Sequence, residues 1–238
     1  MIEKGETERI KTFVDGFDQV IGGGIPKGSV VLISGNPGTM KSSFAFNVLQ
    51  KNAKVLGLRS TYVSLEQSKE SLLRQMKSMK LEVEDSQNIR IIDLGSIREE
   101  LELATADDTV ISVLKEYLLE ELRGWDYSLL VLDSLDVLEL SSGLSSKRSH
   151  IFFLFEWLRE MDITSLLISE ANPEEVLEKG YEEGYLADGI INLTLSADDG
   201  DTVRRRIRCV KMRNTAHDTS YFSLQFSGGH FVVTQSIG

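Results

Sequence analysis

VVLISGNPGTMKSS, residues 30–43, places a strand, a glycine loop and a Lys-Ser pair in immediate succession. The apolar run before Gly35 is typical of a buried strand, and the apolar residues after Ser43 suit a helix. In this order, the backbone N–H groups of the loop and of the first helical turn point at one spot and hold phosphate oxygens. The expected phosphate-binding loop consists of Gly35, Asn36, Pro37, Gly38, Thr39, Met40, Lys41, Ser42 and Ser43.

The residue types in this loop predict that the protein binds a nucleoside triphosphate together with Mg²⁺. Lys41 is expected to neutralise the β- and γ-phosphates, and the Ser42 hydroxyl is expected to ligate Mg²⁺. Ser43 is placed to contact the α-phosphate. The alternative is an ordinary strand-to-helix turn, but packing alone gives no reason for a Lys-Ser pair after such a loop.

Met40 departs from the phosphate-loop pattern G-x-x-x-x-G-K-[ST], because it occupies the position of the second glycine. A side chain at this position predicts a local backbone that avoids any conformation requiring a residue without Cβ. We expect the departure to affect the affinity for nucleotide more than the location of the site.

Two carboxylates are candidates for the chemistry of hydrolysis. Residues 128–133, SLLVLD, predict a buried strand that ends in Asp133, whose carboxylate would complete the Mg²⁺ shell. Glu66 directly follows the expected strand 61–65 and could orient or deprotonate the attacking water. From its position alone, Glu66 could equally stabilise the N-terminus of a helix through the macrodipole.

Short β-rich runs alternate with helical patterns up to residue 187, which is the rhythm of βαβ units. The expected strands are 29–34, 61–65, 89–93, 128–132 and 164–169, and the expected helices are 68–80, 109–122 and 147–161. The later runs 189–195, 203–210, 221–225 and 230–234 are all strand-like. We therefore expect one α/β domain over residues 1–238, with a mainly parallel central sheet flanked by helices and an antiparallel C-terminal extension.

Composition and charge argue against several classes of function. The 26 basic and 37 acidic residues give a net charge of −11, which repels nucleic acids unless positive charge is gathered locally. The one local cluster comprises Arg204, Arg205, Arg206 and Arg208, and we interpret it as a solvated or subunit-facing strand surface. No apolar run of 18 residues or signal peptide is present, and the single Cys209 leaves no zinc-ligand spacing, so we expect a soluble cytoplasmic protein without a membrane span.

Motifs along nearly the whole chain resemble those of a KaiC domain. In chain order they are GFD (16–18), IGGGIPKGS (21–29), YVSLE (62–66), LDSL (132–135), LADGI (186–190) and KMRNTAH (211–217). The resemblance implies a RecA-like P-loop NTPase core with ATP bound between the subunits of a ring-shaped homo-oligomer, most readily a hexamer. It also implies a signalling or regulatory task that involves a protein partner.

The resemblance carries roles to individual positions. Glu66 matches the first of two adjacent catalytic glutamates, whereas the second position is Gln67, whose amide cannot act as a base. Slow hydrolysis is therefore expected. Lys211 and Arg213 match a pair that reaches the γ-phosphate of the neighbouring subunit, as an arginine finger does, and His217 matches a histidine near that interface.

Clock members of the family phosphorylate themselves on an adjacent Ser and Thr. The corresponding positions here are Gly184 and Tyr185, so we expect this autokinase activity to be lost.

Two other functions remain open at this stage. An accessory protein in DNA recombination or repair, of the RecA/RadA-paralogue type, would use the arginine cluster, although the acidic balance does not favour nucleic acid as a partner. A nucleotide-sensing scaffold with little turnover would fit Met40 and Gln67.

Overall fold

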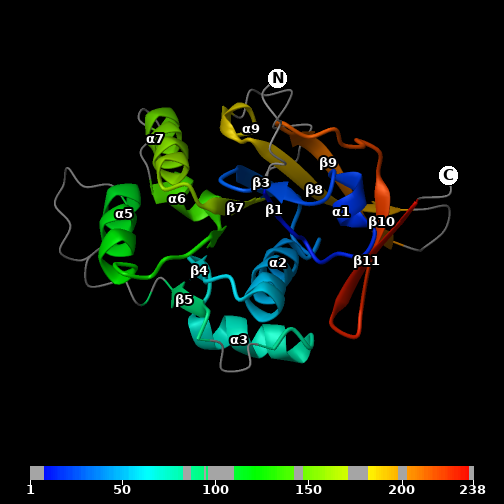
Figure 1. Cartoon of the computed structure of the whole chain (residues 1–238), viewed down its shortest axis with the longest axis horizontal. Coiled ribbons are helices and arrows are strands. Elements are labelled where there is room, and N and C mark those ends of the chain that lie inside the picture. Colours follow the sequence, from blue (N-terminus) through cyan, green and yellow to red (C-terminus); the bar gives the residue numbers. More distant parts are fainter. Residues whose placement is uncertain are drawn as a thin grey trace, which may run out of the picture.

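The computed structural model describes residues 8–82, 87–93, 95, 110–141, 147–170, 182–197 and 203–235. Its centre is a nine-stranded sheet with the strand order β11-β10-β9-β8-β3-β7-β6-β4-β5 (Figure 1). The strands that pair in parallel are β3 (Val30–Ser34), β4 (Ser60–Ser64), β5 (Ile89–Asp93), β6 (Leu129–Asp133), β7 (Thr164–Ser169) and β8 (Gly189–Ala197).

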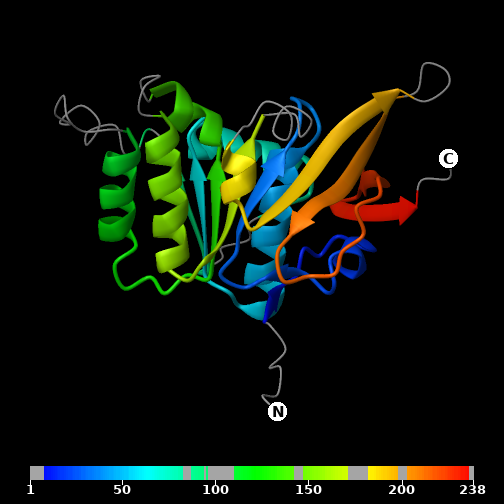
Figure 2. The same cartoon turned by 90° about the horizontal axis from the view of Figure 1, so that it is seen from above.

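The C-terminal part of the sheet is antiparallel. From β8 the sheet continues into β9 (Val203–Met212), β10 (Phe222–Ser227) and β11 (His230–Gln235). The long β8 and β9 extend past the neighbouring strands (Figure 2). The expected fold, a mainly parallel α/β sheet with an antiparallel extension, is confirmed.

Helices cover both faces of the parallel strands because alternate residues of each strand point to opposite sides. On β3, Val31 and Ile33 pack in one apolar cluster with α2 (Lys41–Leu56) and α3 (Lys69–Ser78). Val30 and Leu32 pack in a second cluster on the other face, which contains residues of α5 (Val110–Glu121), α6 (Leu135–Ser141) and α7 (Lys147–Glu160).

Several short elements lie outside the expected pattern. They are β1 (Arg9–Ile10) and β2 (Ile25–Pro26), which pair with each other, α1 (Phe17–Val20), α6 and α9 (Glu182–Leu186). Each is too short for hydrophobic periodicity to reveal it. No helix in the part of the chain that the structure describes is long and apolar enough to cross a membrane.

Candidate nucleotide-binding site

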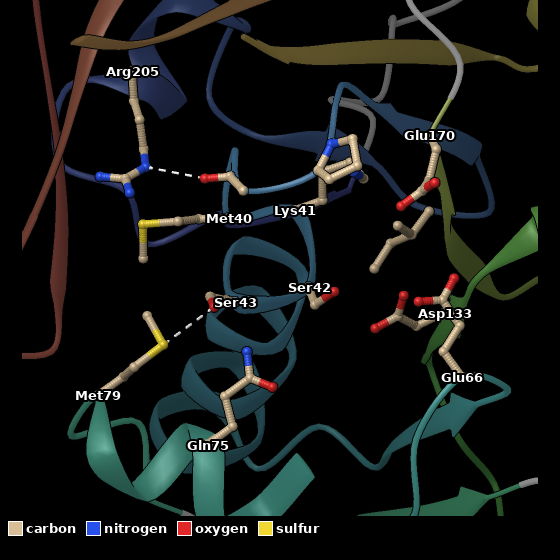
Figure 3. A pocket seen from close by; sticks show the side chains of 13 residues that line it. Met40, Lys41, Ser42, Ser43, Glu66, Gln75, Met79, Asp133, Glu170 and Arg205 are labelled. Carbon is tan, nitrogen blue, oxygen red and sulfur yellow. Dashed lines mark hydrogen bonds between the residues drawn. The ribbon is translucent and has the colours of Figure 1, made fainter. Parts of the chain in front are cut away.

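A cleft of about 370 Å³ lies at the carboxyl ends of the parallel strands, next to the loop that joins β3 to α2 (Figure 3). Ligands of open parallel sheets bind at this edge, where the strand-to-helix loops converge. The residues that line the cleft are Pro37, Gly38, Met40, Lys41, Ser42, Ser43, Glu66, Gln75, Met79, Asp133, Ile168, Glu170 and Arg205. The fold thus brings the expected loop residues, Glu66 and Asp133 together.

The loop packs closely against β8, and two of its side chains donate hydrogen bonds to its own carbonyl oxygens. Gly35 approaches β8 so closely that a Cβ on it would lie 2.0 Å from the Leu193 carbonyl oxygen, so only glycine fits there. The Thr39 hydroxyl donates to the Asn36 carbonyl at 2.8 Å. The Lys41 ammonium donates to the Gly35 and Asn36 carbonyl oxygens at 2.6 and 3.2 Å, which fixes its charge against the loop.

The expectation for the backbone at Met40 is wrong. Met40 keeps the left-handed conformation that glycine favours, with φ 76° and ψ 29°. It is the N-cap of α2, and its carbonyl already accepts from the Phe44 N–H, so the chain must turn there for the helix to begin. A left-handed residue with a side chain costs about 1–2 kcal/mol, which the packing of the Met40 thioether against the core partly offsets.

Replacing Met40 separates the effect of its backbone from that of its side chain. Met40→Gly and Met40→Ala both remove the thioether, but only alanine keeps a Cβ in the left-handed conformation. We expect Met40→Gly to have the larger free energy of unfolding, by about 1 kcal/mol, measured by urea denaturation of both variants. Equal stabilities would mean that residue 40 is not left-handed in solution.

Asp133 sits at the end of β6 with a side chain that is almost wholly buried. The Tyr62 hydroxyl donates to its Oδ2 at 2.5 Å, and Ser42 lines the same cleft. Burial raises the pKa of Asp133, while the hydrogen bond from Tyr62 acts in the opposite direction. A carboxylate beside a hydroxyl is the set of hard oxygen donors that suits Mg²⁺, so Ser42 and Asp133 fit the expected metal position.

Glu66 lies beside Asp133 in the cleft (Figure 3). The Ser134 hydroxyl donates to Glu66 Oε1. The helix-stabilising alternative loses support, because α3 begins at Lys69 and its cap is the Ser68 side chain. Gln67 faces α3 instead, where its amide meets Gln75 and Ser71.

The remaining residues of the cleft were not anticipated from the sequence. Glu170 directly follows β7, just as Glu66 follows β4 and Asp133 ends β6. A search for carboxylates at the ends of the expected strands could therefore have found Glu170. Burial lowers the pKa of Lys41, and nearby carboxylates, with Glu170 the strongest, raise it.

One member of the arginine cluster, Arg205, lines the cleft while its side chain remains exposed, which agrees with a solvated strand surface. Its side chain points into the cleft from β9, and its Nε lies 3.5 Å from the Gly38 carbonyl oxygen (Figure 3). Met79 and Gln75 come from α3. No local pattern marks these three residues, because the packing of β9 and α3 around the loop places them.

Lys211 and Arg213 do not line the cleft of their own chain. The Lys211 ammonium donates to three carbonyl oxygens at the end of α9, those of Gly184, Tyr185 and Ala187, at 3.1, 3.2 and 2.6 Å. Both residues therefore anchor α9, since Arg213 pairs with Asp188 at 2.7 Å and donates to the Tyr185 carbonyl.

His217 is also outside the cleft. Its Nδ1 lies 3.0 Å from the Thr215 carbonyl oxygen. Gly184 and Tyr185, the positions at which we expect clock-type autophosphorylation to be lost, lie in α9.

The parallel sheet, the glycine loop before α2 and the carboxylates at the strand ends define a P-loop nucleotide-binding protein. Within this class, the chain belongs to the KaiC-like ATPase family, because the family model described as "ATPase: KaiC" matches residues 10–236.

Curated relatives and a solved structure support the assignment. A UPF0273 protein of Thermotoga maritima is 30% identical over 97% of this chain and 98% of its own. The circadian clock oscillator protein KaiC of Thermosynechococcus vestitus is 26% identical over 94% of this chain but only 44% of its own length. A crystal structure of a KaiC-like protein from Pyrococcus horikoshii has a TM-score of 0.82 at 27% identity, covering 96% of this chain and 99% of that chain.

Proposed function

We propose that residues 1–238 form one domain that binds Mg-ATP in the cleft and hydrolyses it slowly, as part of a homo-oligomeric ring with a regulatory or signalling task. The observation that carries the proposal is the convergence of Lys41, Ser42, Asp133 and Glu66 in one cleft. These are the charge, the metal ligands and the water-orienting carboxylate that phosphoanhydride hydrolysis requires.

Each side chain has a distinct role in this proposal. The loop amides and Lys41 hold the β- and γ-phosphates, while Ser42 and Asp133 hold Mg²⁺, which supplies charge neutralisation when bound. Glu66 orients the attacking water and accepts its proton, and Ser134 fixes the Glu66 carboxylate through a hydrogen bond. Arg205 lies at the opposite side of the cleft from the carboxylates (Figure 3).

The charge balance of the cleft supports a subunit-bridging site. Among the described residues that line it, three carboxylates, Glu66, Asp133 and Glu170, face two cations, Lys41 and Arg205. Both cations lie against carbonyl oxygens of the loop, Lys41 at 2.6 Å and Arg205 at 3.5 Å. Additional positive charge from an adjacent subunit, supplied by Lys211 and Arg213, would complete the site. A hexameric ring with ATP at each interface and His217 nearby is the assembly that we propose.

Sedimentation of the purified protein tests the proposal. We expect Mg-ATP to shift the protein toward a hexamer, because nucleotide completes the contact between subunits. Lys41→Ala is expected to abolish the shift. Lys51→Ala, which changes a lysine ten residues along α2 outside the cleft, serves as the control and should assemble normally. A wild-type protein that neither binds nucleotide nor assembles would contradict the proposal.

A nucleotide-sensing scaffold is the second candidate. It is favoured by Gln67, whose side chain forms hydrogen bonds with Gln75 and Ser71 of α3. As an amide, Gln67 supplies no second base after β4. Tight ATP binding in an assembled oligomer without phosphate release would select it. The recombination alternative gains no support, since Arg205 lies in the cleft and Arg208 stacks on the Tyr221 ring at 4.4 Å.

A further inference from the structure

Tyr62 carries a hydroxyl group into the interior of the sheet. It lies in the middle of β4, is fully buried, and donates a 2.5 Å hydrogen bond to Oδ2 of Asp133. The strands β4 and β6 pair in parallel with Tyr62 opposite Val131 and Ser64 opposite Asp133, so the tyrosine reaches along the strand to the carboxylate. Phenylalanine would fill the same apolar space, and packing therefore does not explain the hydroxyl.

The ring of Tyr62 connects the carboxylate to the helix that follows the phosphate loop. It packs against Phe46 of α2 with ring centroids 5.7 Å apart. The same helix begins at Lys41 and Ser42, and Ser42 lines the cleft together with Asp133. Tyr62 therefore links the buried carboxylate at the end of β6 to the helix that carries Lys41 and Ser42.

We propose that Tyr62 is a positioning residue for the Mg²⁺ site, which fixes the orientation of the Asp133 carboxylate. This inference rests on the proposed function. A carboxylate anchored at one oxygen cannot rotate freely about its last bond, so its remaining lone pairs keep one direction. Hydrogen-bond partners of this kind orient the ligands of metal sites.

Removing the hydroxyl alone tests this role. The Mg²⁺ midpoint is the Mg²⁺ concentration that gives half of the metal-dependent gain in nucleotide affinity. We expect Tyr62→Phe to raise this midpoint about 10-fold or more, as the loss of other hydrogen-bond partners of metal ligands does. The affinity for nucleotide in EDTA should not change, because phosphate contacts do not involve Tyr62. Both quantities can be measured with a fluorescent ATP analogue titrated with MgCl₂ at constant ionic strength.

Tyr127→Phe is the matched control. It removes the hydroxyl of another buried tyrosine, whose nearest partner is the Met161 sulfur at 3.8 Å, away from the cleft. This control should leave the Mg²⁺ midpoint unaltered. In an Asp133→Asn background, Tyr62→Phe should have no further effect on the midpoint, because both changes act through the same carboxylate.

The outcomes separate this inference from the proposed function. If the wild type gains no nucleotide affinity from Mg²⁺, the proposed function fails. If it does and Tyr62→Phe shows the wild-type midpoint, only the role of Tyr62 is overturned. If Tyr62→Phe does not fold, NMR of the wild type labelled with ¹³C at the tyrosine Cζ tests the proposal instead. Adding Mg²⁺ to the nucleotide complex should shift the Tyr62 signal and leave the Tyr127 signal unchanged. An unshifted Tyr62 signal would refute the proposal.

Discussion

A protein in which Lys211 and Arg213 are both alanine is expected to assemble with Mg-ATP but to hydrolyse it about 1,000-fold or more slowly than the wild type. The reason is that these cations would stabilise charge on the γ-phosphate only in the transition state, from the neighbouring subunit. Phosphate release at saturating ATP measures the effect, since saturation removes any small change in nucleotide affinity.

The same two residues also anchor α9, so their loss needs a structural control. Arg159→Ala provides it, because Arg159 bonds the Leu186 carbonyl and pairs with Asp188 at 3.3 Å, at the same end of α9. We expect Arg159→Ala to lower stability while retaining hydrolysis by the folded protein. An equal loss of hydrolysis in Arg159→Ala would show that the anchoring of α9, rather than charge at the neighbouring site, limits the rate.

Mixing variants tests whether the cations act between subunits. A subunit with the double change keeps its own cleft, and a Glu66→Gln subunit keeps its Lys211 and Arg213. In mixed rings, roughly one interface in four combines an intact cleft with an intact pair, as expected for a head-to-tail contact. Partial recovery of hydrolysis is therefore expected on mixing, and the complete absence of recovery would argue against a site shared between subunits.

Glu66→Gln is expected to slow hydrolysis about 100- to 10,000-fold, the range of general-base catalysis. The amide has nearly the same shape and can still accept the hydrogen bond from Ser134, so the geometry of the cleft is kept while the proton acceptor is lost. Binding of Mg-ATP and assembly should persist. Single-turnover hydrolysis with limiting ATP, together with sedimentation, measures the two properties separately.

Glu70→Gln is the control for this change. It makes the same substitution on the first turn of α3, outside the cleft, and should leave hydrolysis at the wild-type rate. If Glu66→Gln also hydrolyses ATP normally, Glu66 is a structural carboxylate. Glu170, which lines the same cleft, would then be the next candidate for the base.

Lys211 would have to leave its present hydrogen-bond partners in order to contact a phosphate of the neighbouring subunit. Burial lowers the pKa of Lys211, and the adjacent Arg213 lowers it further. Its ammonium now binds three carbonyl oxygens at the end of α9. Contact with a phosphate of the next subunit would replace these bonds, so assembly and the position of α9 should be linked.

Local sequence patterns were sufficient for most of the parallel sheet. The strands 89–93 and 164–169 have the expected bounds, and the Ser68 side chain caps α3 at the start of the expected helix 68–80. These features depend on residues close together in the chain: alternation within a strand, and a side-chain oxygen that accepts from an amide three residues later. The phosphate loop and Asp133 were identified for the same reason, since strand, loop and helix follow each other directly.

The remaining features depended on contacts between distant segments. The left-handed conformation of Met40 follows from the joint demands of the loop and α2, and the motif suggested the opposite. Arg205 reaches the cleft because β9 pairs with β8, which pairs with β3, a register that no local pattern encodes. The hydrogen bond between Tyr62 and Asp133 likewise joins residues 71 positions apart.

The kind of site follows from local sequence, because a phosphate loop is a contiguous chemical motif whose backbone amides and Lys-Ser pair act within one strand-turn-helix unit. How that site is completed depends on contacts between distant segments. The parallel crossovers bring Glu66, Asp133 and Glu170 to one edge, and the sheet register adds Arg205 while holding Lys211 and Arg213 at α9. These positions follow from burying both faces of one sheet, a condition imposed by the whole chain rather than by any segment.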